Sequence, residues 1–145
     1  MGTELTIPEV AQSIILTRTA MKSSSMPEGE ELDSLGKTGA TLAIHLSVRN
    51  LREIERVLTP YYGADCPVAI VYRASWPDER ILRGTLGTIE GLMDEAISRT
   101  ALILVGPALG GETDVRSCLY STDYDRRYRP QSADSPWSSY EHRDD

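Results

Sequence analysis

The chain alternates between short runs of branched apolar residues and longer segments in which apolar residues recur every three or four positions. Runs of the first kind are typical of buried strands, and segments of the second kind are typical of amphipathic helices. The expected strands cover residues 13–18, 41–46, 67–73, 80–86 and 101–106, and the expected helices cover about 28–36, 48–60 and 88–97. This alternation predicts an α/β fold, a single three-layer domain with a mixed, mostly parallel five-stranded sheet.

The boundaries of these elements carry signals of their own. Ser47 lies where a helix is expected to start, and its hydroxyl is predicted to cap the helix over 48–60. The link between the strands over 67–73 and 80–86 is too short for a parallel crossover, so these two strands are expected to be antiparallel.

The regular pattern ends after residue 109. Residues 1–109 are expected to form the α/β domain, and residues 110–130, which retain tyrosines and arginines, are expected to dock on it as a carboxyl-terminal extension. Residues 131–145 are rich in serine, proline and aspartate and have little to bury, so they are expected to be a disordered tail.

The net charge of −7 over 145 residues narrows the expected partners. A negative field repels phosphate backbones, so nucleic acid is not expected to bind. The two cysteines, Cys66 and Cys118, show no paired spacing and no histidine cluster, which predicts reduced thiols and no metal site. No apolar run approaches the ~20 residues that span a bilayer, and no signal peptide is evident, so we expect a soluble cytoplasmic protein without membrane contact.

Basic residues follow three of the expected strands. Arg18, Arg49 and Arg73 come at or just after strand ends, and in open α/β sheets ligands bind outside the carboxyl ends of the strands. If the three arginines converge, they form a basic rim that can bind carboxylates in paired geometry. The alternative is that each arginine pairs with a surface glutamate.

Two further residues in this region have two interpretations each. His45 lies in an otherwise apolar strand, which is compatible with a buried histidine in the core or with a functional base. Trp76 is either an aromatic residue that stacks on a flat ligand or an apolar plug beneath the hairpin.

The acidic residues of the same turn are expected to have a structural role. Adjacent residues of a strand or turn point apart, so Asp78 and Glu79 are predicted to pair with Arg80 or Arg83 and not to act as a catalytic couple. The nucleotide-binding, nucleophile-elbow and metalloprotease motifs do not occur, so no catalytic residue and no metal ligand is assigned.

Several stretches together resemble one known family. They include "GATLAIHLSVRNL", "LTPYYGADCPVAIVYRASWPDERILRGTL", "RTALILVGPAL" and "LYSTDYDRRYRP". They are similar to the carboxyl-terminal half of the precorrin-4 C(11)-methyltransferases and their cobalt-precorrin-4 counterparts, within the tetrapyrrole methylase superfamily. The similarity extends from residue 5 to about residue 130.

The resemblance implies an S-adenosylmethionine-dependent enzyme of cobalamin biosynthesis, with two α/β domains and the methyl donor in the cleft between them. Such enzymes are usually homodimers, and their acceptor is a tetrapyrrole bearing acetate and propionate groups, with or without cobalt. The glycine-rich loop of the amino-terminal domain does not occur here, so the chain is expected to be part of a longer enzyme and inactive alone. The alternative is a folded, non-catalytic dimerisation or ligand-binding module.

The resemblance also assigns roles to particular residues. The segments that contact the donor in the family match Leu46 and Ala74, and their neighbours are added to give the expected cofactor-binding set: Leu46, Ala74, His45, Gly106 and Pro107. The expected substrate-binding set, which would contact the polycarboxylate acceptor, is Arg18, Arg49, Arg73 and Trp76. Methyl transfer from a sulfonium is a direct displacement that depends on positioning and exclusion of water, so no nucleophilic residue is expected.

Overall fold

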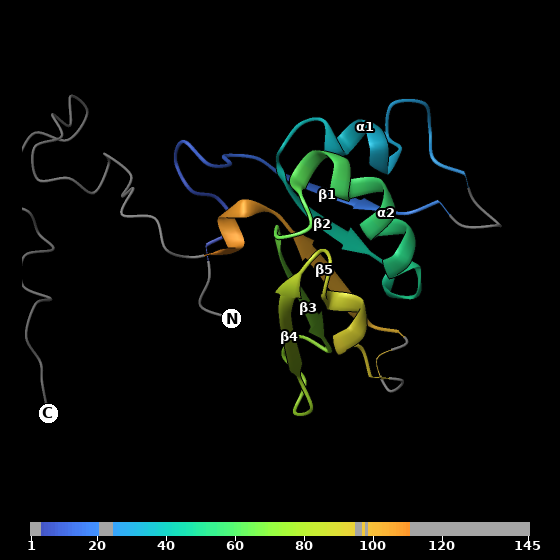
Figure 1. Ribbon diagram of the computed structural model, residues 1–145. Coiled ribbons are helices and arrows are strands. Elements are labelled where there is room, and N and C mark those ends of the chain that lie inside the picture. Colours follow the sequence, from blue (N-terminus) through green and yellow to red (C-terminus); the bar gives the residue numbers. More distant parts are fainter. Residues whose placement is uncertain (1–3, 21–24, 95–96, 98, 111–145) are drawn as a thin grey trace, which may run out of the picture. The chain divides into compact units, whose positions relative to one another are not determined.

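The computed structural model contains a five-stranded sheet whose last strand lies in the middle. The strands are β1 (Ile14–Arg18), β2 (Thr41–His45), β3 (Pro67–Tyr72), β4 (Arg80–Thr85) and β5 (Ala101–Val105). Their order across the sheet is β1-β2-β5-β3-β4 (Figure 1). The structure describes residues 4–20, 25–94, 97 and 99–110, which all belong to one compact unit of residues 1–115. A second unit, residues 116–145, lies outside the described residues, as do the expected tail and all of the expected extension beyond Gly110.

The expectation of a mostly parallel sheet is wrong. Among the described strands, β1 and β2 pair in parallel, whereas β2–β5, β5–β3 and β3–β4 are antiparallel pairs. The helical connections do give β1, β2 and β3 the same direction, as expected from crossovers of this length. However, β5 runs the opposite way and lies between β2 and β3, so both of its ladders are antiparallel.

One face of the sheet is covered by α1 (Leu32–Gly36) and α2 (Leu51–Tyr62) (Figure 1). Alternate strand residues point to this face and form the main core with α2, because side chains on a strand alternate between its two faces. This core includes Leu42, Ile44, Leu58, Val68, Ile70, Ile103 and Val105. No helix in the described part of the chain is long and apolar enough to cross a membrane.

The other face of the sheet has a smaller cover. Ala43, Ala69 and Leu104 point to it and pack with Leu109 of the 3-10 helix η3 (Pro107–Gly110) and with Leu5 near the amino terminus. The expected third layer therefore consists, in the described residues, of η3 and the segment around Leu5.

Two expectations about helices are corrected. The segment over 88–97 is expected to be a main helix, but it contains the short 3-10 helix η2 (Ile89–Leu92), which ends where Met93 is extended. Gly91 lies within this segment, and glycine lowers helix propensity by about 1 kcal/mol relative to alanine. At the other helix, a 3-10 turn η1 (Val48–Asn50) precedes α2, and Ser47 makes no side-chain capping bond to it.

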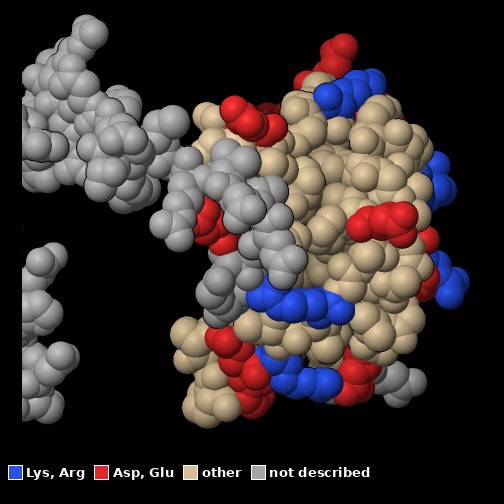
Figure 2. Space-filling model, turned by 60° about the vertical axis from the view of Figure 1, so that its left-hand side comes forward, with Lys and Arg blue, Asp and Glu red and all other residues tan. Residues whose placement is uncertain are grey.

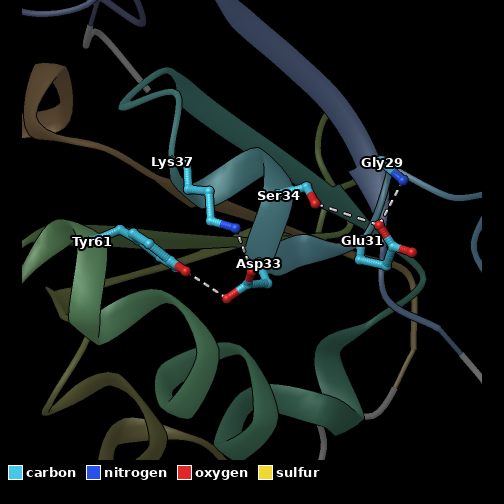
Figure 3. A network of polar contacts seen from close by, with 6 residues as sticks. All are labelled: Gly29, Glu31, Asp33, Ser34, Lys37 and Tyr61. Carbon is cyan, nitrogen blue, oxygen red and sulfur yellow. Dashed lines mark hydrogen bonds and ion pairs between the residues drawn. The ribbon is translucent and has the colours of Figure 1, made fainter.

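The two α-helices are joined by a polar network on their outer side (Figure 3). Tyr61 of α2 donates a hydrogen bond of 2.6 Å to Asp33 of α1, and Lys37 pairs with the same carboxylate at 2.9 Å. The hydrogen bond from Tyr61, followed by the one from Lys37, holds the pKa of Asp33 below its usual value. Before α1, Glu31 accepts a hydrogen bond of 2.8 Å from the backbone N–H of Gly29 and so fixes the entry into the helix.

Candidate functional site at the carboxyl edge of the sheet

One edge of the sheet collects most of the predicted site residues. β1, β2 and β3 end at this edge, and β5 begins there, because β5 runs opposite to its two neighbours. The register shows this directly, since Arg18 pairs with His45 and Tyr72 pairs with Ala101. We call this region, residues 18–19, 45–47, 72–76 and 99–101, the carboxyl edge.

The backbone of the carboxyl edge adopts a conformation that side chains disfavour. Leu46, Arg73 and Thr100, which flank the neighbouring strands β2, β3 and β5, have φ angles of 53°, 48° and 53°. Ser75 in the following turn has a φ of 66°. Such left-handed residues cost about 1–2 kcal/mol each when they are not glycine, and they concentrate at functional sites. The strain is therefore collected along three adjacent strands and not scattered over the described chain, where Glu9 is the other example.

Hydrogen bonds hold this strained backbone in place. The Arg73 N–H donates to the carbonyl oxygen of Thr100 at 2.9 Å, which links the end of β3 to the start of β5. Thr100 is not among the predicted site residues, because the sequence pattern does not show that β5 starts at this edge. If β5 is taken as antiparallel to β2 and β3, its start falls at the carboxyl edge and Thr100 becomes a candidate site residue.

The carboxyl edge exposes two large apolar side chains among polar and basic ones. Leu46 is 75% exposed and Trp76 is 55% exposed. Trp76 is therefore not a plug buried beneath the hairpin. His45 is exposed as well, so the interpretation as a buried core histidine is wrong.

Arg73 is engaged by its own hairpin. Its guanidinium lies 4.9 Å from the ring centre of Trp76 and 5.3 Å from that of Tyr72, and it forms an ion pair with Asp78. An arginine over an aromatic face gains a cation–π attraction, and a paired carboxylate adds to it. The expected pairing of Asp78 with Arg80 or Arg83 is thus replaced by pairing with Arg73.

The other turn residues also have partners that differ from the expectation. Glu79 accepts a hydrogen bond of 2.6 Å from the Ser75 N–H, and Arg80 pairs with Asp94 at 3.0 Å. Figure 2 shows basic and acidic side chains next to one another at the lower end of the molecule, the height at which Figure 1 places the β3–β4 turn. Charges of both signs therefore alternate around this turn.

The three arginines belong to separate elements of the carboxyl edge. Arg18 and Arg73 end strands β1 and β3, with β2 and β5 between them, which separates their backbones by about 14 Å at ~4.8 Å per strand. Arg49 is exposed on η1, after the end of β2. A ligand that contacts both Arg18 and Arg73 must therefore extend across β2 and β5.

Gly106 and Pro107 lie at the opposite edge of the sheet. The strand β5 ends there, beside the starts of β2 and β3, and the Gly106 N–H donates to the carbonyl oxygen of Pro67 at 3.2 Å. A β-carbon on Gly106 would lie 3.0 Å from the Thr41 hydroxyl and 3.1 Å from the Thr41 α-carbon, so a larger residue would fit tightly against Thr41. Gly106 and Pro107, two members of the expected cofactor-binding set, therefore lie apart from Leu46, Ala74 and His45.

The described residues form no group of three or more histidine, cysteine or acidic side chains that could hold a metal ion. Burial raises the pKa of Tyr62 and of Cys66 markedly, but both residues lie away from this edge. The carboxyl edge therefore offers exposed apolar contacts, strained backbone and dispersed basic groups, which is an arrangement for binding and positioning.

A family comparison and two similar proteins all point to methyltransferases that act on tetrapyrroles. Residues 1–90 match the family described as tetrapyrrole (corrin/porphyrin) methylases. Two similar proteins are the precorrin-4 C(11)-methyltransferases of a Sinorhizobium species, 55% identical over 130 residues, and of Pseudomonas aeruginosa, 52% identical over 131 residues. These alignments cover 89% and 90% of this chain but 51% and 52% of the relatives, so the chain spans about half the length of the curated relatives it matches.

A solved structure shows the same similarity in three dimensions. The X-ray structure of a cobalamin biosynthetic enzyme, a cobalt precorrin-4 methyltransferase, superposes with a TM-score of 0.69 and is 38% identical. The superposition covers 74% of this chain and 45% of that one.

Proposed function

This chain belongs to the tetrapyrrole (corrin/porphyrin) methylase family, and on that basis we propose that it is the carboxyl-terminal half of an S-adenosylmethionine-dependent precorrin-4 C(11)-methyltransferase of cobalamin biosynthesis. The similarity to two precorrin-4 C(11)-methyltransferases at 55% and 52% identity supports the substrate and the reaction. The assignment to the carboxyl-terminal half rests on the sequence segments that resemble that half of the family.

The observation that carries the site assignment is the row of left-handed residues along the carboxyl edge. Leu46 and Ala74 are the proposed donor contacts, and both lie in this row or directly beside it. His45 is a further proposed contact. The donor role of Gly106 and Pro107 stays a prediction, and their position at the opposite edge argues against it.

The proposed acceptor fits the spacing of the basic residues. A tetrapyrrole is wide and flat and carries several carboxylates, so separate side groups can reach Arg18, Arg49 and Arg73 although these arginines are spread along the edge. The exposed ring of Trp76 offers a surface on which the macrocycle can stack.

The chemistry asks the protein to bind, orient and exclude water. S-adenosylmethionine supplies a methyl group on a positively charged sulfur. The acceptor carbon would donate the electron pair of the new carbon–carbon bond, and the electron pair of the broken carbon–sulfur bond would stay on the sulfur. A rigid edge that holds donor and acceptor in line lowers the entropy cost of this step. We assign no nucleophile and no metal ligand to the chain, and we propose a cytoplasmic homodimer.

The test compares the complete protein with the 145-residue chain. The complete protein should transfer the methyl group of labelled S-adenosylmethionine to precorrin-4 or to its cobalt form, detected as the mass gain of one methylated product. The chain alone should show no turnover and weak or undetectable donor binding in a calorimetric titration. Micromolar donor affinity of the chain alone, or a complete protein that methylates neither tetrapyrrole, would contradict the proposal.

A further inference from the structure

A chain of polar side chains lies directly behind the carboxyl edge. Ser47 is 1% exposed and Thr19 is 5% exposed, so both hydroxyls are buried. Asn50 of η1 completes the group. Buried polar groups are costly unless they are hydrogen-bonded, and no buried side-chain nitrogen or oxygen in the described residues lacks a partner.

The hydrogen bonds in this group all run in one direction. The Asn50 amide donates to the Thr19 hydroxyl at 2.7 Å, the Thr19 hydroxyl donates to the Ser47 hydroxyl at 2.9 Å, and the Ser47 hydroxyl donates to the His45 carbonyl oxygen at 2.6 Å. The direction is fixed because an amide N–H only donates, a carbonyl oxygen only accepts, and each hydroxyl has one hydrogen. A fourth bond of 2.8 Å runs from the Thr19 N–H to the Ser47 hydroxyl.

The chain of bonds ends on the residue that precedes the strained Leu46. The bond from Ser47 to the His45 carbonyl spans Leu46 and closes a small ring around it, as side chains of serine do in tight turns. The two bonds from Thr19 also tie the segment after β1 to the segment after β2, beyond the last strand pair, Arg18 with His45. Hydrogen bonds that run in one direction strengthen one another in a buried setting, so the group can keep Leu46 in its left-handed conformation.

We propose that Ser47 and Thr19 are positioning residues that hold the left-handed Leu46, and with it the donor-contacting edge, in the geometry that binds S-adenosylmethionine. This inference rests on the donor site of the proposed function. Neither residue contacts the donor itself in this proposal, because both hydroxyls are buried behind the edge.

The test uses variants that remove a hydroxyl and variants that keep it. In the complete protein, Ser47→Ala and Thr19→Val should each raise the dissociation constant for S-adenosylhomocysteine about tenfold, which corresponds to the loss of one neutral buried hydrogen bond and an unpaired partner. Thr19→Ser keeps the hydroxyl and should restore binding. The KM for the tetrapyrrole should change far less than the KM for the donor.

A matched control separates positioning from loss of stability. The Thr59 hydroxyl donates to the Glu55 carbonyl oxygen at 2.7 Å within α2, which is a similar bond away from the carboxyl edge. Thr59→Ala loses one half-buried hydrogen bond but gains helix propensity, so it should change the urea midpoint less than Ser47→Ala. Donor binding is compared where both variants are fully folded, and it should be unchanged in Thr59→Ala. Equal effects of both variants on donor binding, or unchanged binding in Ser47→Ala, would overturn the positioning role.

A measurement that needs no ligand tests the role of Ser47 separately from the proposed function. In the 145-residue chain, the carbon chemical shifts of Leu46 should report a left-handed backbone, and Ser47→Ala should shift them toward extended values. Unchanged shifts in Ser47→Ala would contradict the inference whatever the donor affinity. Absence of donor binding by the unaltered complete protein, with the shift present, would contradict the proposed function alone.

Discussion

Arg73 is held by neighbours from its own hairpin, although the sequence predicts a cation available to a carboxylate ligand. Its guanidinium lies over the rings of Tyr72 and Trp76 and pairs with Asp78. A guanidinium has five N–H donors in a planar fork, so one ion pair leaves donors that can bind a second carboxylate. In the proposed enzyme, Asp78 therefore competes with an acidic group of the acceptor for Arg73.

This competition predicts opposite effects for the two partners. In the complete protein, Arg73→Ala should raise the KM for the tetrapyrrole about tenfold, because a charge-assisted contact is lost. Asp78→Asn should lower the same KM about two- to fivefold, which is the range expected for an exposed ion pair. Steady-state kinetics with each substrate varied in turn measures both effects, and the KM for the donor should change less.

The neighbouring carboxylate provides the control. Glu79 accepts a hydrogen bond from Ser75 and not from Arg73, so Glu79→Gln should leave the KM for the tetrapyrrole near its original value. A raised KM in Asp78→Asn, or equal losses for donor and acceptor in Arg73→Ala, would remove Arg73 from the acceptor site.

The pattern of apolar residues predicts which segments are strands but not whether each strand is parallel or antiparallel to its neighbours. All five expected strands exist within about one residue of their expected bounds, because branched apolar runs identify buried strands well. Side chains alternate between the two faces of a sheet in parallel and in antiparallel strands alike, so the apolar pattern over 101–106 does not indicate the direction of β5. Direction depends on the pairing of β5 with β2 and β3, where Leu104 meets Ala43 on one side and Ala69 on the other only in the folded chain.

The contact between α1 and α2 depends on a glycine that the sequence shows only as a helix end. A β-carbon on Gly36 would lie 2.7 Å from a ring carbon of Tyr61 and 3.1 Å from a methyl group of Leu58. The Tyr61 ring cannot turn away freely, because its hydroxyl is bonded to Asp33 (Figure 3). Gly36→Ala should therefore lower the free energy of unfolding by about 1–2 kcal/mol, as overpacking outweighs the gain in helix propensity. Urea unfolding followed by circular dichroism measures the change.

A second glycine in a helical segment serves as the control. Gly91 lies in η2, and a β-carbon there would meet nothing within 4 Å. Gly91→Ala should leave the urea midpoint unchanged or raise it slightly. A neutral Gly36→Ala would show that the two helices can separate without cost.

Across the whole described unit, the sequence predicts which strand ends meet only where a crossover connection fixes the direction of the strand. The ends of β1, β2 and β3 share an edge as expected, since such connections join them. Gly106 follows β5, which runs opposite to β2 and β3, so Gly106 lies at the other edge of the sheet. The hydrogen bond between Ser47 and Thr19 joins residues 28 positions apart, so no local pattern indicates it.

Two buried ionisable groups, Cys66 and Tyr62, make the stability of the folded chain depend on pH. Near the edge opposite to the proposed site, burial raises the pKa of the Cys66 thiol to about 11 and that of the Tyr62 hydroxyl to about 12, from ordinary values of 9.0 and 10.0. Both groups hold their proton more tightly in the folded chain than in the unfolded chain. Their contribution to stability is therefore complete below about pH 9 and is lost as the pH rises toward 11 and 12.

The expected result is a urea midpoint that falls steadily above about pH 9, and removal of either group should flatten one part of that fall. Cys66→Ala should flatten it between about pH 9 and 11, since the unfolded chain then no longer releases this proton first. Tyr62→Phe should act between about pH 10 and 12, at the cost of the hydrogen bond from the Tyr62 hydroxyl to the Ala40 carbonyl oxygen. A midpoint that stays constant up to about pH 11 in the unaltered chain, or a slope that neither variant changes, would show that these two groups are not what limits alkaline stability.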